Sequence, residues 1–251
     1  RVTGIGGTLI NGQAGPLDFP RVTRCVVIST LGGDDSMLLD GPGNPVTIAR
    51  DLQVNTGTGH DTVELQRVTV RGHTRIDTST GNDMVALIDS LLTGVANIRT
   101  GSEPPRRGFA PAESDADTFT VLGSRFNRML TLNMGMDDDT WDQDNSVVDL
   151  GVLAYTGSGN DTVRFERGND NAGVPSVFVS PPLVFTGTGD DRIEIGRAGQ
   201  AGRFAQFFGG FILDAAIGID TLDAGLLGQP NTNGNVFARL PAIRGVELQV
   251  S

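Results

Sequence analysis

Residues 156–163 read Thr-Gly-Ser-Gly-Asn-Asp-Thr-Val, and nearly the same phrase stands at residues 56–63 and 186–193. Each copy is a glycine-rich turn followed by an aspartate and an apolar β-type residue. Weaker copies are centred on further aspartates, namely Asp35, Asp83, Asp117, Asp139 and Asp220. Three intervals between successive aspartates are 22 residues, and the others run from 26 to 34 residues. A fixed period with occasional insertions is typical of a solenoid.

Residues at fixed offsets from these aspartates form apolar columns. The column on the amino-terminal side of the turn holds Ile28, Val54, Ile76, Ile98, Leu132, Ala154, Val184 and Leu213. The column two residues after the aspartate holds Met37, Val63, Val85, Phe119, Trp141, Val163, Ile193 and Leu222. The column four residues after it is also apolar, and only Gln143 breaks it. Polar residues alternate with these columns, which predicts strands with one buried face.

Strands that recur at intervals of one coil must stack in parallel, because the chain returns to the same edge each time. A further column, made of Val70, Leu92, Phe126 and Val148, predicts another strand on a different face of each coil. The sequence therefore predicts an all-β, single-domain, right-handed parallel β-helix of about eight to nine coils.

The predicted domain covers residues 1–251, with an N-terminal cap at 1–24, repeat coils at 25–225, and a last coil with a C-terminal cap at 226–251. Loop insertions interrupt the period at residues 101–114, 166–182 and 196–210. Loops that protrude from a rigid solenoid are a usual place for binding surfaces, although tolerated surface insertions have the same appearance.

The composition restricts the class of partner. The chain has 35 Gly, no Lys and a formal net charge of -11, so nucleic acid and anionic membranes are not expected partners. No apolar run is long enough to span a membrane. The single cysteine, Cys25, is expected to be a small buried residue. The expected partners are cations, an extracellular polysaccharide or another surface protein.

The turn phrase resembles the haemolysin-type calcium-binding nonapeptide repeat, Gly-Gly-x-Gly-x-Asp-x-apolar-x, at residues 57–63, 157–163 and 187–193. That resemblance implies an exported protein, at the cell surface or outside the cell, that binds Ca²⁺ between successive coils. The period here is about 22 residues rather than nine, so one corner of each coil carries the motif. The candidate calcium ligands are Asp61, Asp161 and Asp191, with Asp83 and Asp139 from the weaker copies.

The aspartate column has a second explanation that needs no metal. If the carboxylates stack in register about 5 Å apart, each neighbouring pair repels by about 3 kcal/mol at an effective dielectric of 20. Bound Ca²⁺ would relieve this repulsion. Alternatively, each aspartate accepts hydrogen bonds from backbone N–H groups of its own turn and points away from its neighbours. No other cofactor is required.

The competing function is catalysis, because many right-handed parallel β-helices are polysaccharide lyases or hydrolases. The best candidate groove is the outward column Asn55, Asp77, Arg99, Asn133 and Tyr155, with a basic edge formed by Arg67, Arg71, His73 and Arg75. The chain has one Tyr and one Trp, and its two histidines lack any nucleophile pattern. We therefore predict a non-catalytic secreted or cell-surface module with a structural, adhesive or binding role. The alternative is a glycan-active β-helix that uses the strand face near Asp77 and Arg99.

Overall fold

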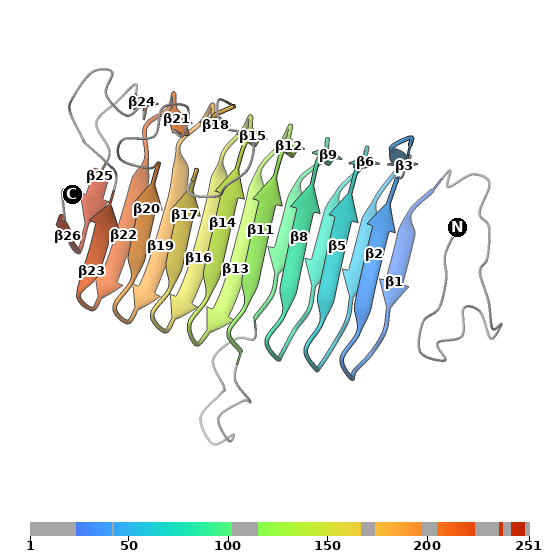
Figure 1. Ribbon diagram of the computed structural model, residues 1–251, viewed down its shortest axis with the longest axis horizontal. Coiled ribbons are helices and arrows are strands. Elements are labelled where there is room, and N and C mark those ends of the chain that lie inside the picture. The colour runs from blue at the N-terminus through green and yellow to red at the C-terminus, as the bar shows by residue number, and fades with distance from the viewer. Residues whose placement is uncertain are drawn as a thin grey trace.

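The computed structural model describes residues 24–41, 43–101, 115–166, 174–196, 205–223, 236–237 and 242–248. Among these residues all regular secondary structure is β, arranged as three parallel sheets around a common core (Figure 1). The described part of the chain contains no helix that could span a membrane. The prediction of an all-β parallel solenoid is therefore confirmed.

Each coil contributes one strand to each sheet. Sheet one contains β1 (Val26–Ser29), β4 (Leu52–Asn55), β7 (Thr74–Asp77), β10 (Ala96–Arg99), β13 (Leu130–Met136), β16 (Val152–Ser158), β19 (Pro182–Thr188), β22 (Ile212–Ile217) and β25 (Ala242–Arg244). Sheet two contains β2 (Ser36–Asp40), β5 (Thr62–Gln66), β8 (Met84–Ile88), β11 (Thr118–Leu122), β14 (Thr140–Asp144), β17 (Thr162–Phe165), β20 (Arg192–Ile195), β23 (Asp220–Asp223) and β26 (Val246–Leu248). Sheet three contains β3 (Val46–Ile48), β6 (Val68–Val70), β9 (Leu91–Leu92), β12 (Arg125–Phe126), β15 (Val147–Val148), β18 (Ser176–Phe178), β21 (Ala205–Phe207) and β24 (Val236–Phe237).

About seven complete turns, from β1 to β21, have all three strands described together with their side chains, slightly fewer than the eight to nine coils expected. Strands β22 to β26 continue the same sheets. The predicted N-terminal cap lies outside the described residues, except for Arg24. Residues 102–114, 167–173 and 197–204, which carry much of the three predicted insertions, also lie outside them.

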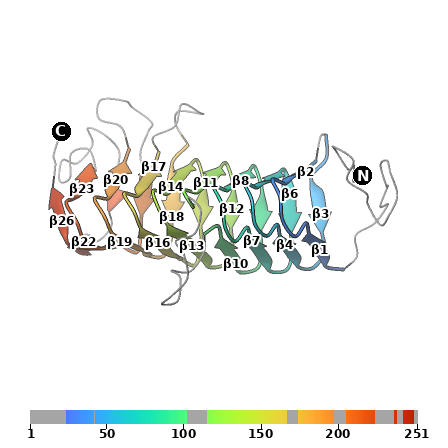
Figure 2. The ribbon, with the colours of Figure 1, turned by 90° about the horizontal axis from the view of Figure 1, so that it is seen from below.

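The three sheets surround the core along the whole length of the solenoid. Figure 2 shows sheet one and sheet two along opposite edges of the view, with strands of sheet three between them. The first corner of each coil joins sheet one to sheet two, and the second corner joins sheet two to sheet three. With strands about 4.8 Å apart, the nine strands of sheet one span about 38 Å.

The predicted apolar columns are the core. Ile76, Ile98 and Leu132 pair in register and are fully buried. Gln143, which breaks its column, is also fully buried, and its amide has no hydrogen-bond partner among the described residues. The prediction for Cys25 was wrong. It precedes the first strand, where no earlier described coil covers it, and its side chain is exposed.

Candidate functional site

The first corner carries a continuous aspartate ladder, with one aspartate in each coil. The Oδ1 atom of each aspartate accepts a hydrogen bond from the backbone N–H of the aspartate one coil earlier, at 2.8 to 2.9 Å. The members of this aspartate ladder are Asp35, Asp61, Asp83, Asp117, Asp139, Asp161, Asp191 and Asp220. We had expected hydrogen bonds from each aspartate's own turn, but these N–H groups come from the neighbouring coil. The ladder therefore ties successive coils together.

The ladder is buried inside the wall of the solenoid. Asp61, Asp83, Asp139, Asp161 and Asp191, the candidate calcium ligands, are each at most 2% exposed. Burial is the main reason why the pKa of Asp83 rises to about 6 and that of Asp161 to about 7. It also raises the pKa of Asp191. Carboxylates on adjacent coils repel one another, which adds to each of these increases. Near neutral pH Asp161 is therefore partly protonated, whereas Asp83 is mostly ionised.

A column of threonine residues opposes this increase in the pKa of the aspartates. The hydroxyl of Thr156 donates a hydrogen bond to Oδ2 of Asp161, which lowers the pKa of that carboxyl. The hydroxyl of Thr100 acts in the same direction on Asp117, whose pKa burial nevertheless raises to about 8. Thr156 therefore contributes to the ladder as a donor, which the sequence pattern alone did not show.

In the coil of Asp139, Met134 takes the place of the threonine, as Ala215 does in the coil of Asp220. Met134 has no hydroxyl to donate and is fully buried. Oδ2 of Asp139 has no hydrogen-bond partner among the described residues. Burial, together with the charges of Asp117, Asp161 and Asp115, raises the pKa of Asp139 to about 10. Asp139 is therefore the ladder member that most strongly retains its proton.

The geometry of the first corner bears on the calcium hypothesis. Ca²⁺ takes six to eight oxygen ligands, most of them carboxylate or carbonyl oxygens. Each aspartate of the ladder uses Oδ1 for a backbone N–H, which leaves one carboxylate oxygen per coil. Within the described ranges, no three acidic, histidine or cysteine side chains converge as a metal-binding group. The described residues fit a hydrogen-bonded ladder better than a calcium site.

Glycines let the first corners of adjacent coils approach closely. Gly157 has a φ of +117°, and a Cβ there would lie 1.9 Å from the carbonyl oxygen of Gly135. Where the repeat has lost a glycine, Ser79 and Asp137 still adopt positive φ, of 75° and 66°. The backbone conformation of the turn is thus kept where its glycines are not, at a cost of about 1–2 kcal/mol for each such residue.

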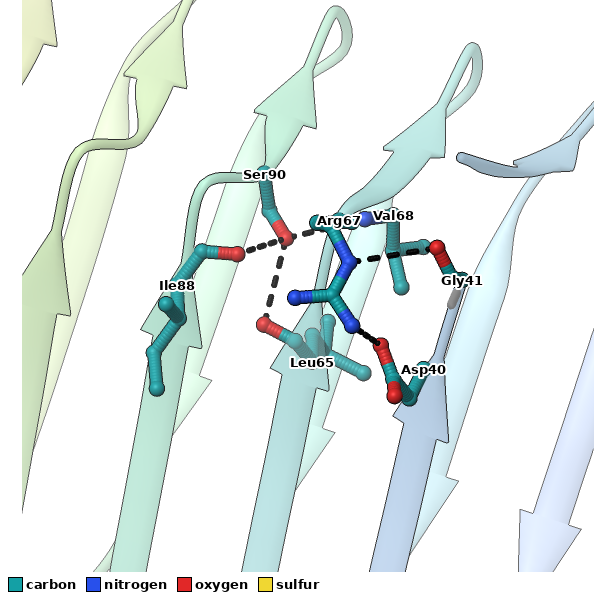
Figure 3. Close-up of polar contacts among 7 residues, drawn as sticks. All are labelled: Asp40, Gly41, Leu65, Arg67, Val68, Ile88 and Ser90. Carbon is teal, nitrogen blue, oxygen red and sulfur yellow. Dashed lines mark hydrogen bonds and ion pairs between the residues drawn. The ribbon is translucent and has the colours of Figure 1, made fainter. Parts of the chain in front are cut away.

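The second corner carries a serine ladder, made of Ser90, Ser124, Ser146 and Ser176. The Oγ atoms of the last three accept the N–H of the preceding serine at 3.0 to 3.2 Å, and Oγ of Ser90 accepts the N–H of Val68. Ser90 also donates to the carbonyl oxygens of Ile88 and Leu65, as Figure 3 shows. The serine ladder performs the same task as the aspartate ladder with a neutral group.

The predicted basic edge does not form one surface. Arg67 lies at the second corner, where it pairs with Asp40 and donates from Nε to the carbonyl oxygen of Gly41 at 3.1 Å (Figure 3). Arg75 instead lies on the outer face of sheet one, where it pairs with Asp77 at 3.1 Å. His73 accepts the N–H of Val95 through Nδ1, so its other ring nitrogen carries the proton. These groups hold neighbouring segments together.

The outer face of sheet one has a polar half in its early coils. Asp77 and Arg99 are neighbours in register, as predicted. Asp77 accepts a hydrogen bond from Arg75, and Nε of Arg99 donates to the carbonyl oxygen of Gly101 at 3.1 Å. The predicted pair is therefore brought together on one face, with each side chain held by a residue two positions away.

The same face becomes apolar in its later coils. On β16 and β19, the rings of Tyr155 and Phe185 stack with centroids 5.0 Å apart and planes inclined by 13°. Tyr155 is 43% exposed, and the neighbouring outward column runs from Leu153 through Leu183 to the exposed Ile212. We call Leu153, Tyr155, Leu183, Phe185 and Ile212 the apolar strip.

Sequence reasoning had placed Tyr155 on the outward column but missed the strip as a whole. Outward leucines on two successive coils, beside adjacent aromatic residues, were the signal available. Comparisons of the chain with protein-family models, with curated proteins and with solved structures gave no match.

Proposed function

We propose that this solenoid is a non-catalytic structural and adhesive module of a secreted or cell-surface protein, and that its apolar strip binds another protein. The observation that carries the proposal is the outward apolar strip on β16, β19 and β22. Large apolar side chains that gather on one exposed face mark interaction sites. The hydrogen-bonded ladders at two corners support the structural role, because they fix the spacing of the coils behind the strip.

The ring geometry favours a protein surface over a polysaccharide. A sugar ring packs against the open face of an aromatic ring. Tyr155 and Phe185 lie nearly parallel and cover one face of each other. Their edges and the branched side chains of Leu153, Leu183 and Ile212 suit the irregular apolar surface of a protein.

The glycan-active alternative depends on Asp77 and Arg99, which form hydrogen bonds with Arg75 and Gly101, respectively. Incubation with neutral and uronate-containing polysaccharides, followed by assays for new reducing ends and unsaturated products, tests this alternative. We expect no turnover. Turnover that is lost in Asp77→Asn would replace the binding role with catalysis.

The binding role is tested by capturing proteins from a surface extract of the source cells. Wild-type protein should retain a partner that Leu183→Arg does not retain, because the substitution places a charge at the centre of the strip. Asn97→Arg is the matched control, since Asn97 occupies the same outward column in the polar half and is exposed. A partner retained equally by all three proteins would count against the strip.

Calcium binding by Asp61, Asp83, Asp139, Asp161 and Asp191 stays a prediction. Thermal melts after exhaustive EDTA treatment, repeated with increasing Ca²⁺ and with Mg²⁺ as a control, test it. A ligand that binds only the folded chain raises the melting temperature with its concentration. The buried ladder leads us to expect no Ca²⁺-specific rise, and such a rise would show that the wall opens to admit the ion.

A further inference from the structure

We infer that the apolar strip binds a second copy of this chain, face to face, about a two-fold axis that runs along β19. This inference rests on the proposed function, because it takes the strip to be a docking surface and names its occupant. The supporting observation is that residues on either side of β19 match one another chemically.

Two outward columns of sheet one define the surface. The first runs Thr131, Leu153, Leu183, Ile212 and Ala242, and the second runs Asn133, Tyr155, Phe185, Asp214 and Arg244. A two-fold axis along β19 brings together residues that lie equally far from β19 on opposite sides. Two such faces would pack about 10 Å apart, as stacked sheets do.

The apolar residues match under this operation. Leu183 and Phe185 each meet their own counterparts at the axis, and Leu153 meets Ile212 of the second copy. The interface is therefore isologous, with the same patch used on both chains. Its centre is entirely apolar, as the centre of a protein–protein interface usually is.

The polar residues at the rim also match. Tyr155 faces Asp214 of the second copy, so the phenol hydroxyl can donate to that carboxylate. One coil further out, Asn133 faces Arg244 of the second copy, so its amide oxygen can accept from the guanidinium. Arg244 is exposed and Asp214 is half-buried, and among the described residues no ion pair engages either side chain.

Charge excludes the same operation in the early coils of the face. An axis along β7 would place Arg75 against Arg75 of the second copy, and an axis along β10 would do the same for Arg99. Like charges directly opposed across an interface are unfavourable. Only the later coils combine an apolar centre with unlike polar groups around it.

Two features make this association weak. Five strands about 4.8 Å apart present a small contact, below the 800 Å² or so per partner of a standard interface. Each chain also carries a formal charge of -11, so the two copies repel at low ionic strength. We expect a dissociation constant on the order of 0.1 mM that decreases as salt screens this repulsion.

Analytical ultracentrifugation of the full chain, from about 10 µM to about 1 mM protein, tests the inference. Cys25→Ser is the background, because the exposed thiol would otherwise form disulfide dimers. We expect a monomer–dimer equilibrium that Leu183→Arg abolishes and Asn97→Arg leaves within about twofold. Thermal melts confirm that each variant is folded, and both positions lie on the outer face.

A charge exchange tests the geometry. Tyr155→Asp should weaken dimerisation at least tenfold, because it opposes Asp214 of the second copy. Adding Asp214→Arg should restore it, since the two charges are then opposite in sign. A monomer at 1 mM, a dimer that tolerates Leu183→Arg, or a double variant that stays as weak as Tyr155→Asp would overturn the inference. Strip-dependent capture of a different protein by a monomeric chain would leave the proposed function standing.

Discussion

The first and second corners of each coil bind a backbone N–H of the neighbouring coil with different chemical groups. Each corner must supply a hydrogen-bond acceptor for a buried backbone N–H of the neighbouring coil. The first corner uses a carboxylate, as where Asp161 accepts the N–H of Asp139. The second corner uses a hydroxyl, as where Ser124 accepts the N–H of Ser90. The carboxylate ladder titrates and the hydroxyl ladder does not, so the aspartate ladder makes stability depend on pH.

The two corners also differ in how closely the coils approach. In the first corner a Cβ on Gly157 would collide with a backbone carbonyl oxygen. In the second corner the positive-φ position is occupied by Arg67, Asp89 and Asn145, and Arg67 pairs with Asp40 of the preceding coil. The close approach of adjacent coils therefore restricts which residues can occupy a corner more than the left-handed backbone conformation does.

The largest expected effect comes from placing asparagine at a glycine in each corner. Asparagine tolerates the left-handed backbone at Gly123 (φ +59°) but not the φ of +117° at Gly157, so close approach and backbone strain act together at Gly157. Gly157→Asn should lower the free energy of unfolding by about 4 kcal/mol, because its Cβ would lie 1.9 Å from the carbonyl oxygen of Gly135. Gly123→Asn should cost at most about 1 kcal/mol, since the nearest atom is on the exposed side chain of Asp89. Urea unfolding measures both, and equal costs would contradict this account.

The next effect is the pH dependence of stability. Burial raises the pKa of Asp83, Asp161, Asp117 and Asp139 from 3.8 to about 6, 7, 8 and 10. Between pH 4 and pH 10 the folded chain therefore binds more protons than the unfolded chain. The ladder's contribution is fully present below about pH 4 and is lost as pH rises through these values. Melting temperatures measured across this range should decrease toward alkaline pH.

The Asp139→Asn variant tests whether Asp139 causes this pH dependence of stability. Asparagine keeps an oxygen that can accept the N–H of Asp117 but has no proton to lose. The variant should match wild type near pH 4 and exceed its melting temperature near pH 9. Asp138→Asn is the control, because Asp138 is exposed and accepts the N–H of Asn160 in the same way. If the melting temperature of Asp139→Asn changed with pH as steeply as that of wild type, another group would cause the pH dependence.

A smaller effect is expected when the serine ladder is broken. Ser124→Ala leaves the buried N–H of Ser90 without its acceptor and removes the donor to the carbonyl oxygen of Leu87. The free energy of unfolding should decrease by about 1–3 kcal/mol at every pH. Ser36→Ala, at an exposed serine, should cost less than about 0.5 kcal/mol. Faster amide hydrogen exchange at Ser90 would locate the break, and unchanged exchange would argue that the ladder bond is unimportant.

The smallest effect concerns the pKa of Asp139 itself. Met134→Thr would give Asp139 the hydroxyl that Thr156 gives Asp161. The pKa of Asp139 should decrease from about 10 toward the value of about 7 at Asp161, as followed by carboxyl NMR chemical shifts. Met134→Leu is the control, because it retains an apolar neighbour. A pKa that stays near 10 in Met134→Thr would leave burial alone as the explanation.

The repeat phrase was enough to predict the parallel solenoid, because apolar columns at fixed offsets can be buried together only if successive coils stack in register. Ile76, Ile98 and Leu132 pair as that pattern requires. The serine ladder was not predicted, since four serines spaced by 22 to 34 residues have no distinctive local pattern. Their role is visible only where Ser90 and Ser124 meet across two coils.

The sequence by itself determined where each coil turns, since only certain residues tolerate the first corner, and which residues enter the core, since strand alternation fixes the buried face. The tertiary structure decided what the aspartates do. A carboxylate after a glycine-rich turn can bind calcium or accept hydrogen bonds from the backbone of its own turn. The sequence left both alternatives open. Stacking the coils placed an N–H from the neighbouring coil at Oδ1 and excluded water from the remaining oxygen. Burial and register, which are properties of the stacked coils, therefore set the chemistry of the ladder.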